Sequence, residues 1–122
     1  MERLALPEQP VHGDAHLGNV MMSARGPLWN DWEDTFLGAL AWDLGCLRAS
    51  VAPFGRRDLK LVADAYAGYG DGVDPEALTT FIDARRFQAS VWGLVIGQAR
   101  SDRQQVEKRL TWLRHRYSRT VA

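Results

Sequence analysis

The chain has 122 residues, of which 46% are apolar and 25% charged, proportions that are typical of one compact globular domain. The formal net charge is zero, so no overall field favours nucleic acid or a membrane surface as a partner. The single cysteine excludes an internal disulfide, and no apolar run reaches the roughly 20 residues that a membrane-spanning helix needs. The start of the chain also lacks the pattern of a secretory signal peptide. We therefore expect one cytoplasmic domain, residues 1–122, without a nucleic-acid or membrane partner.

The first forty residues carry the strand signals. Residues 1–10 contain two prolines and are expected to form an irregular lead-in. Short apolar runs in PVHGD and NVMM predict two strands around a loop, and PLWNDW is expected to pair with NVMM across the turn ARGP. The strand pattern ends at Leu37.

The rest of the chain shows apolar residues at helical spacing. We predict helices over 39–51, 57–70, 75–99 and from Ser101 or Asp102 to about 118. Asp74 is the expected N-cap of the third helix, with Pro75 in its first position. The predicted fold class is α+β and mainly helical, with a short β-hairpin followed by about four helices.

The C-terminal segment is the basic part of the chain. Residues 100–122 contain 7 Lys and Arg against 2 Asp and Glu. Such a helix can bind nucleic acid or a membrane surface, but no interleaved aromatic residues indicate base stacking. We expect a solvated outer face whose apolar side packs on the preceding helix.

Two short stretches, HGDAHLGN at 12–19 and DWED at 31–34, contain the candidate catalytic and metal-binding residues. An aspartate on a glycine-flanked loop, such as Asp14, can orient a substrate hydroxyl or accept its proton during phosphoryl transfer. Asn19 and Asp31 both offer oxygen atoms to Mg²⁺, which takes one or two protein ligands besides phosphate oxygens. One base, one amide and one carboxylate, brought together by a hairpin, form a minimal phosphoryl-transfer site.

A different interpretation uses the two histidines. His12, Asp14 and His16 would share one face if the segment were a strand, and they could then hold Zn²⁺ in a metal-dependent hydrolase. Gly13 and Gly18 favour a loop instead. The metal content of the purified protein separates the two interpretations.

The order of these motifs resembles a known family. H-G-D-x-H-x-x-N, followed by D-W-E-D and then W-D-L, is similar to the catalytic segment of the aminoglycoside phosphotransferase family, which has a protein-kinase-like fold. The motifs fall within residues 11–45, and the matching positions are His12, Gly13, Asp14, His16, Gly18, Asn19, Asp31, Trp32, Glu33, Gly38, Asp43 and Leu44.

The resemblance implies ATP-dependent phosphoryl transfer to a hydroxyl of a small molecule. Asp14 would be the catalytic base, and His12 would orient the loop. Asn19 and Asp31 would bind Mg²⁺ together with ATP, and Asp43 would be a buried acid that braces the loop.

The sequence also departs from the family pattern. Asn30 stands where an aliphatic residue is usual, and would need a hydrogen-bond partner if buried. The lobe that holds the nucleotide in this family would precede residue 12. We therefore expect a C-lobe fragment whose helical part is 39–119, with little or no activity alone. A homo-oligomer or a partner chain would supply the missing lobe.

Two further points stay open at this stage. Glu33 and Asp34 either help to bind a cationic acceptor or form a solvated turn. The domain is either a phosphotransferase or a non-catalytic interaction or vestigial domain.

Overall fold

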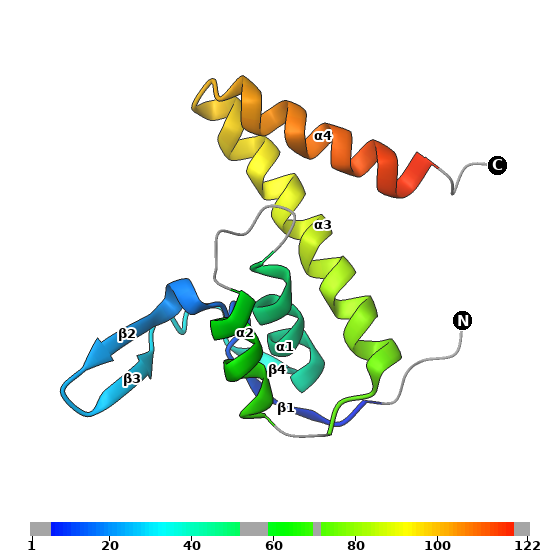
Figure 1. The fold of residues 1–122 in the computed structure, drawn as a ribbon. Helices are drawn as coiled ribbons and strands as arrows, with labels where there is room; N and C mark the ends of the chain where they lie inside the picture. Colours follow the sequence, from blue (N-terminus) through cyan, green and yellow to red (C-terminus); the bar gives the residue numbers. More distant parts are fainter. Residues whose placement is uncertain (1–5, 52–58, 70–71, 119–122) are drawn as a thin grey trace. The chain divides into compact units, whose positions relative to one another are not determined.

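A computed structural model of the chain describes residues 6–51, 59–69 and 72–118 (Figure 1). In chain order its elements are β1 (Glu8–Val11), the 3₁₀ turn η1 (Leu17–Asn19), β2 (Val20–Ser23), β3 (Gly26–Trp29), β4 (Phe36–Ala39), α1 (Leu40–Ala49), α2 (Leu59–Ala67), α3 (Pro75–Ala99) and α4 (Arg103–Tyr117). The predicted α+β class is confirmed, with small two-stranded sheets and a larger helical part.

Strands β2 and β3 form the predicted antiparallel hairpin, with Val20 opposite Trp29 and Ser23 opposite Gly26. The turn between them is closed by Ser23, whose hydroxyl donates to the carbonyl of Gly26 at 2.8 Å and accepts from the backbone N–H of Arg25 at 3.1 Å. Gly26 has a φ of 105°, a conformation that a side chain would disfavour. The hairpin is a local structure, because both strands and their turn lie within ten residues.

The second sheet corrects two sequence-based expectations. β1 pairs with β4 in an antiparallel register that runs from Glu8 opposite Ala39 to Val11 opposite Phe36. The strand pattern therefore does not end at Leu37, and the lead-in is not irregular over Glu8–Pro10. No short-range sequence pattern predicts this pairing, because the loop and the whole β2–β3 hairpin lie between the two strands in the chain. Pro10 is compatible with it because each strand has a partner on one side only.

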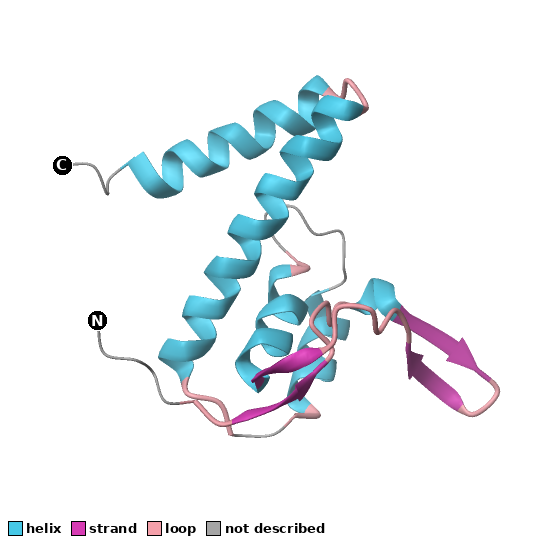
Figure 2. Ribbon diagram, turned by 180° about the vertical axis from the view of Figure 1, so that it is seen from behind, coloured by secondary structure: helices cyan, strands magenta, loops and turns pink. Residues whose placement is uncertain are grey.

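Helix α1 is the centre of the core. Six of its residues are buried, including Leu44 and Leu47 at 1% exposure, and it begins directly where β4 ends. Figure 2 shows the strands in magenta, with β1 and β4 beside this helix. The helix predicted over 39–51 is confirmed with both ends shortened. α2 occupies the middle of the range predicted as 57–70, and residues 57, 58 and 70 lie outside the described part of the chain.

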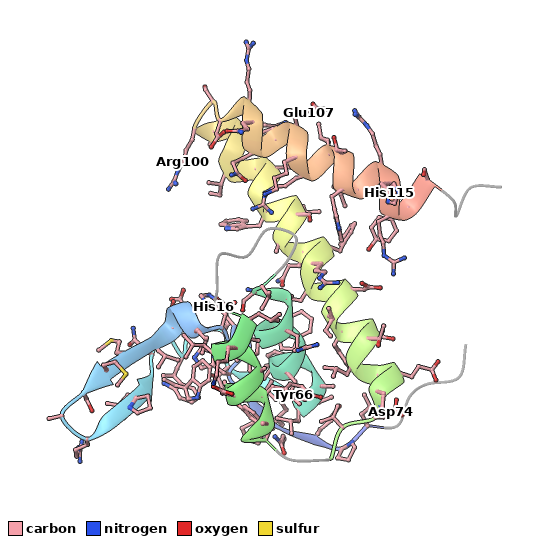
Figure 3. The ribbon with its side chains drawn as sticks, in the orientation of Figure 1. His16, Tyr66, Asp74, Arg100, Glu107 and His115 are labelled. Carbon is pink, nitrogen blue, oxygen red and sulfur yellow. The ribbon has the colours of Figure 1, made fainter. Side chains whose placement is uncertain are left out.

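Both long C-terminal helices begin at the predicted caps. The Asp74 side chain, labelled in Figure 3 at the start of α3, accepts the backbone N–H of Ala77 at 2.7 Å. The side chain of Asp102 accepts the N–H of Gln105 at 3.1 Å at the start of α4. α3 has the predicted limits of 75–99. Aspartate at these positions satisfies backbone donors that a helix leaves unpaired at its N-terminus.

The contacts divide the chain into two compact units, Met1–Arg85 and Arg86–Ala122, and the division falls within α3. In the second unit α4 packs against the end of α3. Arg109 donates to the carbonyl of Ala89 at 2.7 Å, and the side chain of Val106 lies over Gly97. The expected packing of the basic helix on its predecessor is confirmed. In the described residues, no helix is both long and apolar enough to cross a membrane.

Candidate active site

The loop that begins at His12 is fixed by a carboxylate from α1. The backbone N–H of His12 donates to Oδ2 of Asp43 at 2.7 Å, and the N–H of Gly13 donates to Oδ1 at 2.9 Å. Asp43 is 7% exposed and lies in the first turn of α1. A buried carboxylate needs hydrogen-bond donors, and two backbone N–H groups on one carboxylate also fix the direction of the loop.

The carbonyl of Gly13 faces the same helix. It accepts a hydrogen bond from Nε1 of Trp42 at 2.6 Å, and the thiol of Cys46 lies 3.7 Å away. Gly13 has a φ of 87°, and a Cβ at this position would overlap the backbone carbonyl of Asp34. Only glycine fits here without a shift of the backbone. Burial raises the pKa of the Cys46 thiol to about 12, which makes this cysteine unreactive at neutral pH.

Both ring nitrogens of His12 take part in the loop. Nε2 lies 2.8 Å from the carbonyl of Asn30, and Nδ1 accepts the backbone N–H of Asp14 at 3.3 Å. These contacts place the ring proton on Nε2. The ring also packs between Trp29 and Trp32, with centroid distances of 5.3 and 4.6 Å. His12 therefore ties the loop to the segment that follows the hairpin.

The side chain of Asp14 is contacted by the side chains of Asn19, His16 and Arg85. The amide nitrogen of Asn19 donates to its backbone carbonyl at 3.0 Å and to its Oδ2 at 3.3 Å. Nε2 of His16 lies 3.4 Å from Oδ2, and the guanidinium of Arg85 contacts Oδ1. The hydrogen bond with His16 and the charge of Arg85 lower the pKa of Asp14 to about 2, against the opposing effect of burial.

Asn30 links the two halves of the site. Its backbone N–H donates to the carbonyl of Asn19 at 2.8 Å, which extends the β2–β3 ladder by one step, and its carbonyl faces His12. Asp31 follows directly, with a φ of 64° and an exposed side chain. The side chain of Asn30 is exposed as well, so its departure from the aliphatic pattern leaves no amide buried without a partner.

Glu33 and Asp34 are exposed in the turn that leads to β4. The structure therefore brings Asp14, Asn19, His12 and Asp43 into one bonded cluster and attaches Asp31 to it through the backbone. Glu33 and Asp34 lie on the solvent side of that cluster.

The geometry gives no support to a zinc site. Within 6–51, 59–69 and 72–118, no three His, Cys, Asp or Glu side chains are grouped as metal ligands. One ring nitrogen of His12 contacts the carbonyl of Asn30 and the other accepts the N–H of Asp14, and Gly13 turns the chain between His12 and Asp14. The shared strand face that this alternative required does not form.

One contributor, Arg85, was not identified from the sequence. Trp42 and His16 lie within the motifs, but Arg85 is 71 residues away from Asp14. In the predicted helix 75–99, Arg85 lies one helical turn after Phe81. Sequence spacing alone does not show which helix faces the loop.

A cavity of about 410 Å³ opens between the hairpin and the end of α2. Its walls are mostly apolar and include Leu17, Val20, Trp29 and Tyr69. Leu17 and Val20 flank Asn19 in the chain, so the cavity begins next to the bonded cluster.

A braced aspartate, a nearby amide and an exposed carboxylate are groups that phosphoryl-transfer sites use for orienting a hydroxyl and for holding Mg²⁺. A family model described as the phosphotransferase enzyme family matches residues 1–80, about two-thirds of the chain. The protein therefore belongs to this family, and the resemblance found in the motifs is confirmed. No curated protein and no solved structure matches the chain.

Proposed function

We propose that this chain carries the site for ATP-dependent phosphoryl transfer to a hydroxyl group of a small molecule. The observation that supports the proposal most is the Asp14 carboxylate, held in place beside Asn19 on a loop that Asp43 braces. The loop lies within residues 1–80, which the model of the phosphotransferase enzyme family matches.

In the proposed reaction, the acceptor oxygen forms a bond to the γ-phosphorus while the bond to the β,γ-bridging oxygen breaks and ADP leaves. The proton of the hydroxyl passes to Asp14. A carboxyl group with a pKa of about 2 is a weak base, so Asp14 mainly orients the hydroxyl. It takes the proton once bonding to phosphorus has made the hydroxyl acidic, which is consistent with a transition state that needs little deprotonation in advance.

Asn19 and Asp31 both offer oxygen atoms, the type of ligand that Mg²⁺ prefers. Both hydrogen bonds of the Asn19 amide to Asp14 are donated by Nδ2, so its oxygen is not used in them. Asp31 presents an exposed carboxylate two residues after Trp29, at the Val20–Trp29 end of the hairpin. Mg²⁺, when bound, neutralises charge on the phosphate oxygens.

The cavity between the hairpin and α2 suits the organic part of a substrate. Its walls are apolar, and Leu17 and Val20 place it next to Asn19. The acceptor class is left open by these residues. Exposed Glu33 and Asp34 would favour an acceptor that carries a positive charge.

A second candidate function, a surface for binding another chain, is supported by exposed apolar side chains in the first unit. Met22 is 77% exposed, Leu37 71% and Met21 55%. Exposed apolar groups of this size mark interaction surfaces. We propose that a second copy or a partner chain covers them. Light scattering tests the first possibility, since a monomer at micromolar concentration would contradict it.

The decisive experiment has an activity arm and a binding arm. The full chain is incubated with Mg·ATP and a panel of aminoglycosides and amino alcohols, and phosphorylated product is measured by mass spectrometry. Binding of Mn²⁺, used as a paramagnetic substitute for Mg²⁺, is measured by electron paramagnetic resonance. We expect Asp14→Asn to remove product formation and Asp31→Asn to weaken Mn²⁺ binding at least tenfold.

Asp64→Asn is the matched control, because Asp64 is an exposed aspartate of α2 that pairs with Lys60 outside the site. This variant should retain both properties. Full turnover by Asp14→Asn would overturn the assignment of the base. Equal Mn²⁺ affinity in the Asp31 and Asp64 variants would overturn the assignment of the metal ligand.

A further inference from the structure

Arg85 is a cation that contacts the proposed base and comes from a different part of the chain. It lies in α3, and a terminal nitrogen of its guanidinium contacts Oδ1 of Asp14. Both side chains are mostly removed from solvent, with 19% of Arg85 and 23% of Asp14 exposed. An ion pair with this degree of burial is screened less than a surface pair and holds its partners more firmly.

The packing of α3 explains why Arg85 reaches the loop. Phe81 lies one helical turn earlier on the same face of α3. Its backbone approaches Gly45 of α1 so closely that a Cβ on Gly45 would come within 2.9 Å of it. The ring of Phe81 meets Trp42 edge-on at 6.1 Å, and Trp42 in turn donates to the carbonyl of Gly13. One packed contact therefore positions both Arg85 and the loop that carries Asp14.

The two carboxylate oxygens of Asp14 have different neighbours. Oδ1 faces Arg85, whereas Oδ2 lies 3.3 Å from the amide nitrogen of Asn19 and 3.4 Å from Nε2 of His16. Asp43, which is engaged with the loop backbone, and the buried thiol of Cys46 are two further ionisable groups near the pair. With one oxygen held from α3, the carboxylate cannot rotate freely about its Cβ–Cγ bond.

We propose that Arg85 is a positioning residue of this site, which holds Oδ1 of Asp14 so that Oδ2 is the oxygen presented to the acceptor hydroxyl. The inference rests on the proposed phosphoryl transfer. A planar guanidinium is suited to this task because its N–H groups have fixed directions, whereas a lysine ammonium acts as a point charge on a flexible stem. Misplacement of a reacting group by about 1 Å costs up to about 100-fold in rate.

The kinetic test compares Arg85→Gln and Arg85→Lys with the unchanged chain, with Mg·ATP and whichever acceptor in the panel is phosphorylated. We expect kcat to fall about 10- to 100-fold in Arg85→Gln, with the KM for ATP changed less than twofold. The kcat of Arg85→Lys should lie between that of Arg85→Gln and that of the unchanged chain, because lysine restores the charge but not the geometry of the guanidinium. An unchanged kcat in Arg85→Gln, or a loss confined to KM, would overturn the inference.

A spectroscopic test does not depend on turnover. In the labelled full chain at neutral pH, the side-chain nitrogen resonances of Arg85 are recorded with and without Asp14→Asn. We expect the Arg85 resonances to shift in that variant and to stay in place in Arg25→Gln, which removes an exposed arginine from the hairpin turn. If the Arg85 resonances keep their positions in Asp14→Asn, the proposed contact between Arg85 and Asp14 is wrong. Absence of turnover in the unchanged chain together with the expected shift would contradict phosphoryl transfer by this chain alone, but it would support the contact between Arg85 and Asp14.

Discussion

The two segments that carry the candidate site are held in different ways. Residues 12–13 are buried and bonded to α1, and Asp14 is contacted from the loop and from α3, whereas residues 31–34 are exposed throughout. The protein thus fixes the orientation of the proposed base before any ligand binds, while the proposed metal ligand faces solvent. A base gains from such preorganisation, whereas a carboxylate on Mg²⁺ is ordered by the ion itself. Substitutions in the first segment should therefore change stability, and those in the second should mainly change ligand binding.

The largest effect is expected at Asp43. Asp43→Ala leaves two backbone N–H groups without their acceptors in a buried place, which should lower the free energy of unfolding by about 3–5 kcal/mol. Asp43→Asn keeps one acceptor oxygen and should lower the free energy of unfolding by less than Asp43→Ala. Urea titration measures both, with exposed Asp31→Asn as the comparison, expected within about 0.5 kcal/mol of the unchanged chain. Equal losses at Asp43 and Asp31 would remove the contrast between the two segments.

Gly13→Ala should come next, at about 3 kcal/mol, because the new Cβ meets both an unfavourable φ and the carbonyl of Asp34. Gly26→Ala is the matched control. Gly26 also has a positive φ, but no atom lies within 4 Å of its added Cβ, so only about 1 kcal/mol of backbone strain is expected. Similar losses in the two variants would show that the close approach to Asp34 contributes nothing.

The Asp14 carboxyl should make stability depend on pH in the acid range. Its pKa is about 2 in the folded chain and near 3.8 when unperturbed, so the unfolded chain binds its proton first as the pH falls. The ionised group then stabilises the fold by about 2 kcal/mol at neutral pH, and this contribution is lost between about pH 4 and pH 2.

Unfolding curves of Asp14→Asn and of the unchanged chain should therefore differ at pH 7 and converge towards pH 2. Asp34→Asn, in the exposed turn, is the control and should follow the unchanged chain at every pH. A difference between Asp14→Asn and the unchanged chain that stays constant from pH 7 to pH 2 would contradict the role of the carboxyl charge.

The smallest effect concerns the backbone at Asp31. Its φ of 64° is tolerated by aspartate and asparagine better than by most residues. Asp31→Ala should therefore lose about 1 kcal/mol of stability, while Asp31→Asn loses almost none, although both remove the carboxylate proposed to bind Mg²⁺. Thermal unfolding gives the stability difference, and equal melting temperatures for the two variants would show that this turn relaxes freely.

Local signals made parts of the fold predictable. Asp74 and Pro75 mark the start of α3, Asp102 caps α4, and the NVMM and PLWNDW runs flank a short turn. Each signal lies within a few residues, so the free energy that it reflects does not depend on the rest of the chain. The same is true of the motif itself, since the order of His12, Asp14 and Asn19 is enough to suggest the loop.

The sequence by itself determined the helices, the hairpin and the family, and it named the residues of the proposed site. Only the tertiary structure decided that β1 pairs with β4, that Asp43 receives the N–H groups of His12 and Gly13, and that Arg85 reaches Asp14. These contacts join residues that are 25 to 71 positions apart in the chain. Their formation depends on how whole elements bury apolar surface against each other. A sequence pattern confined to one element does not predict which other element will pack against it.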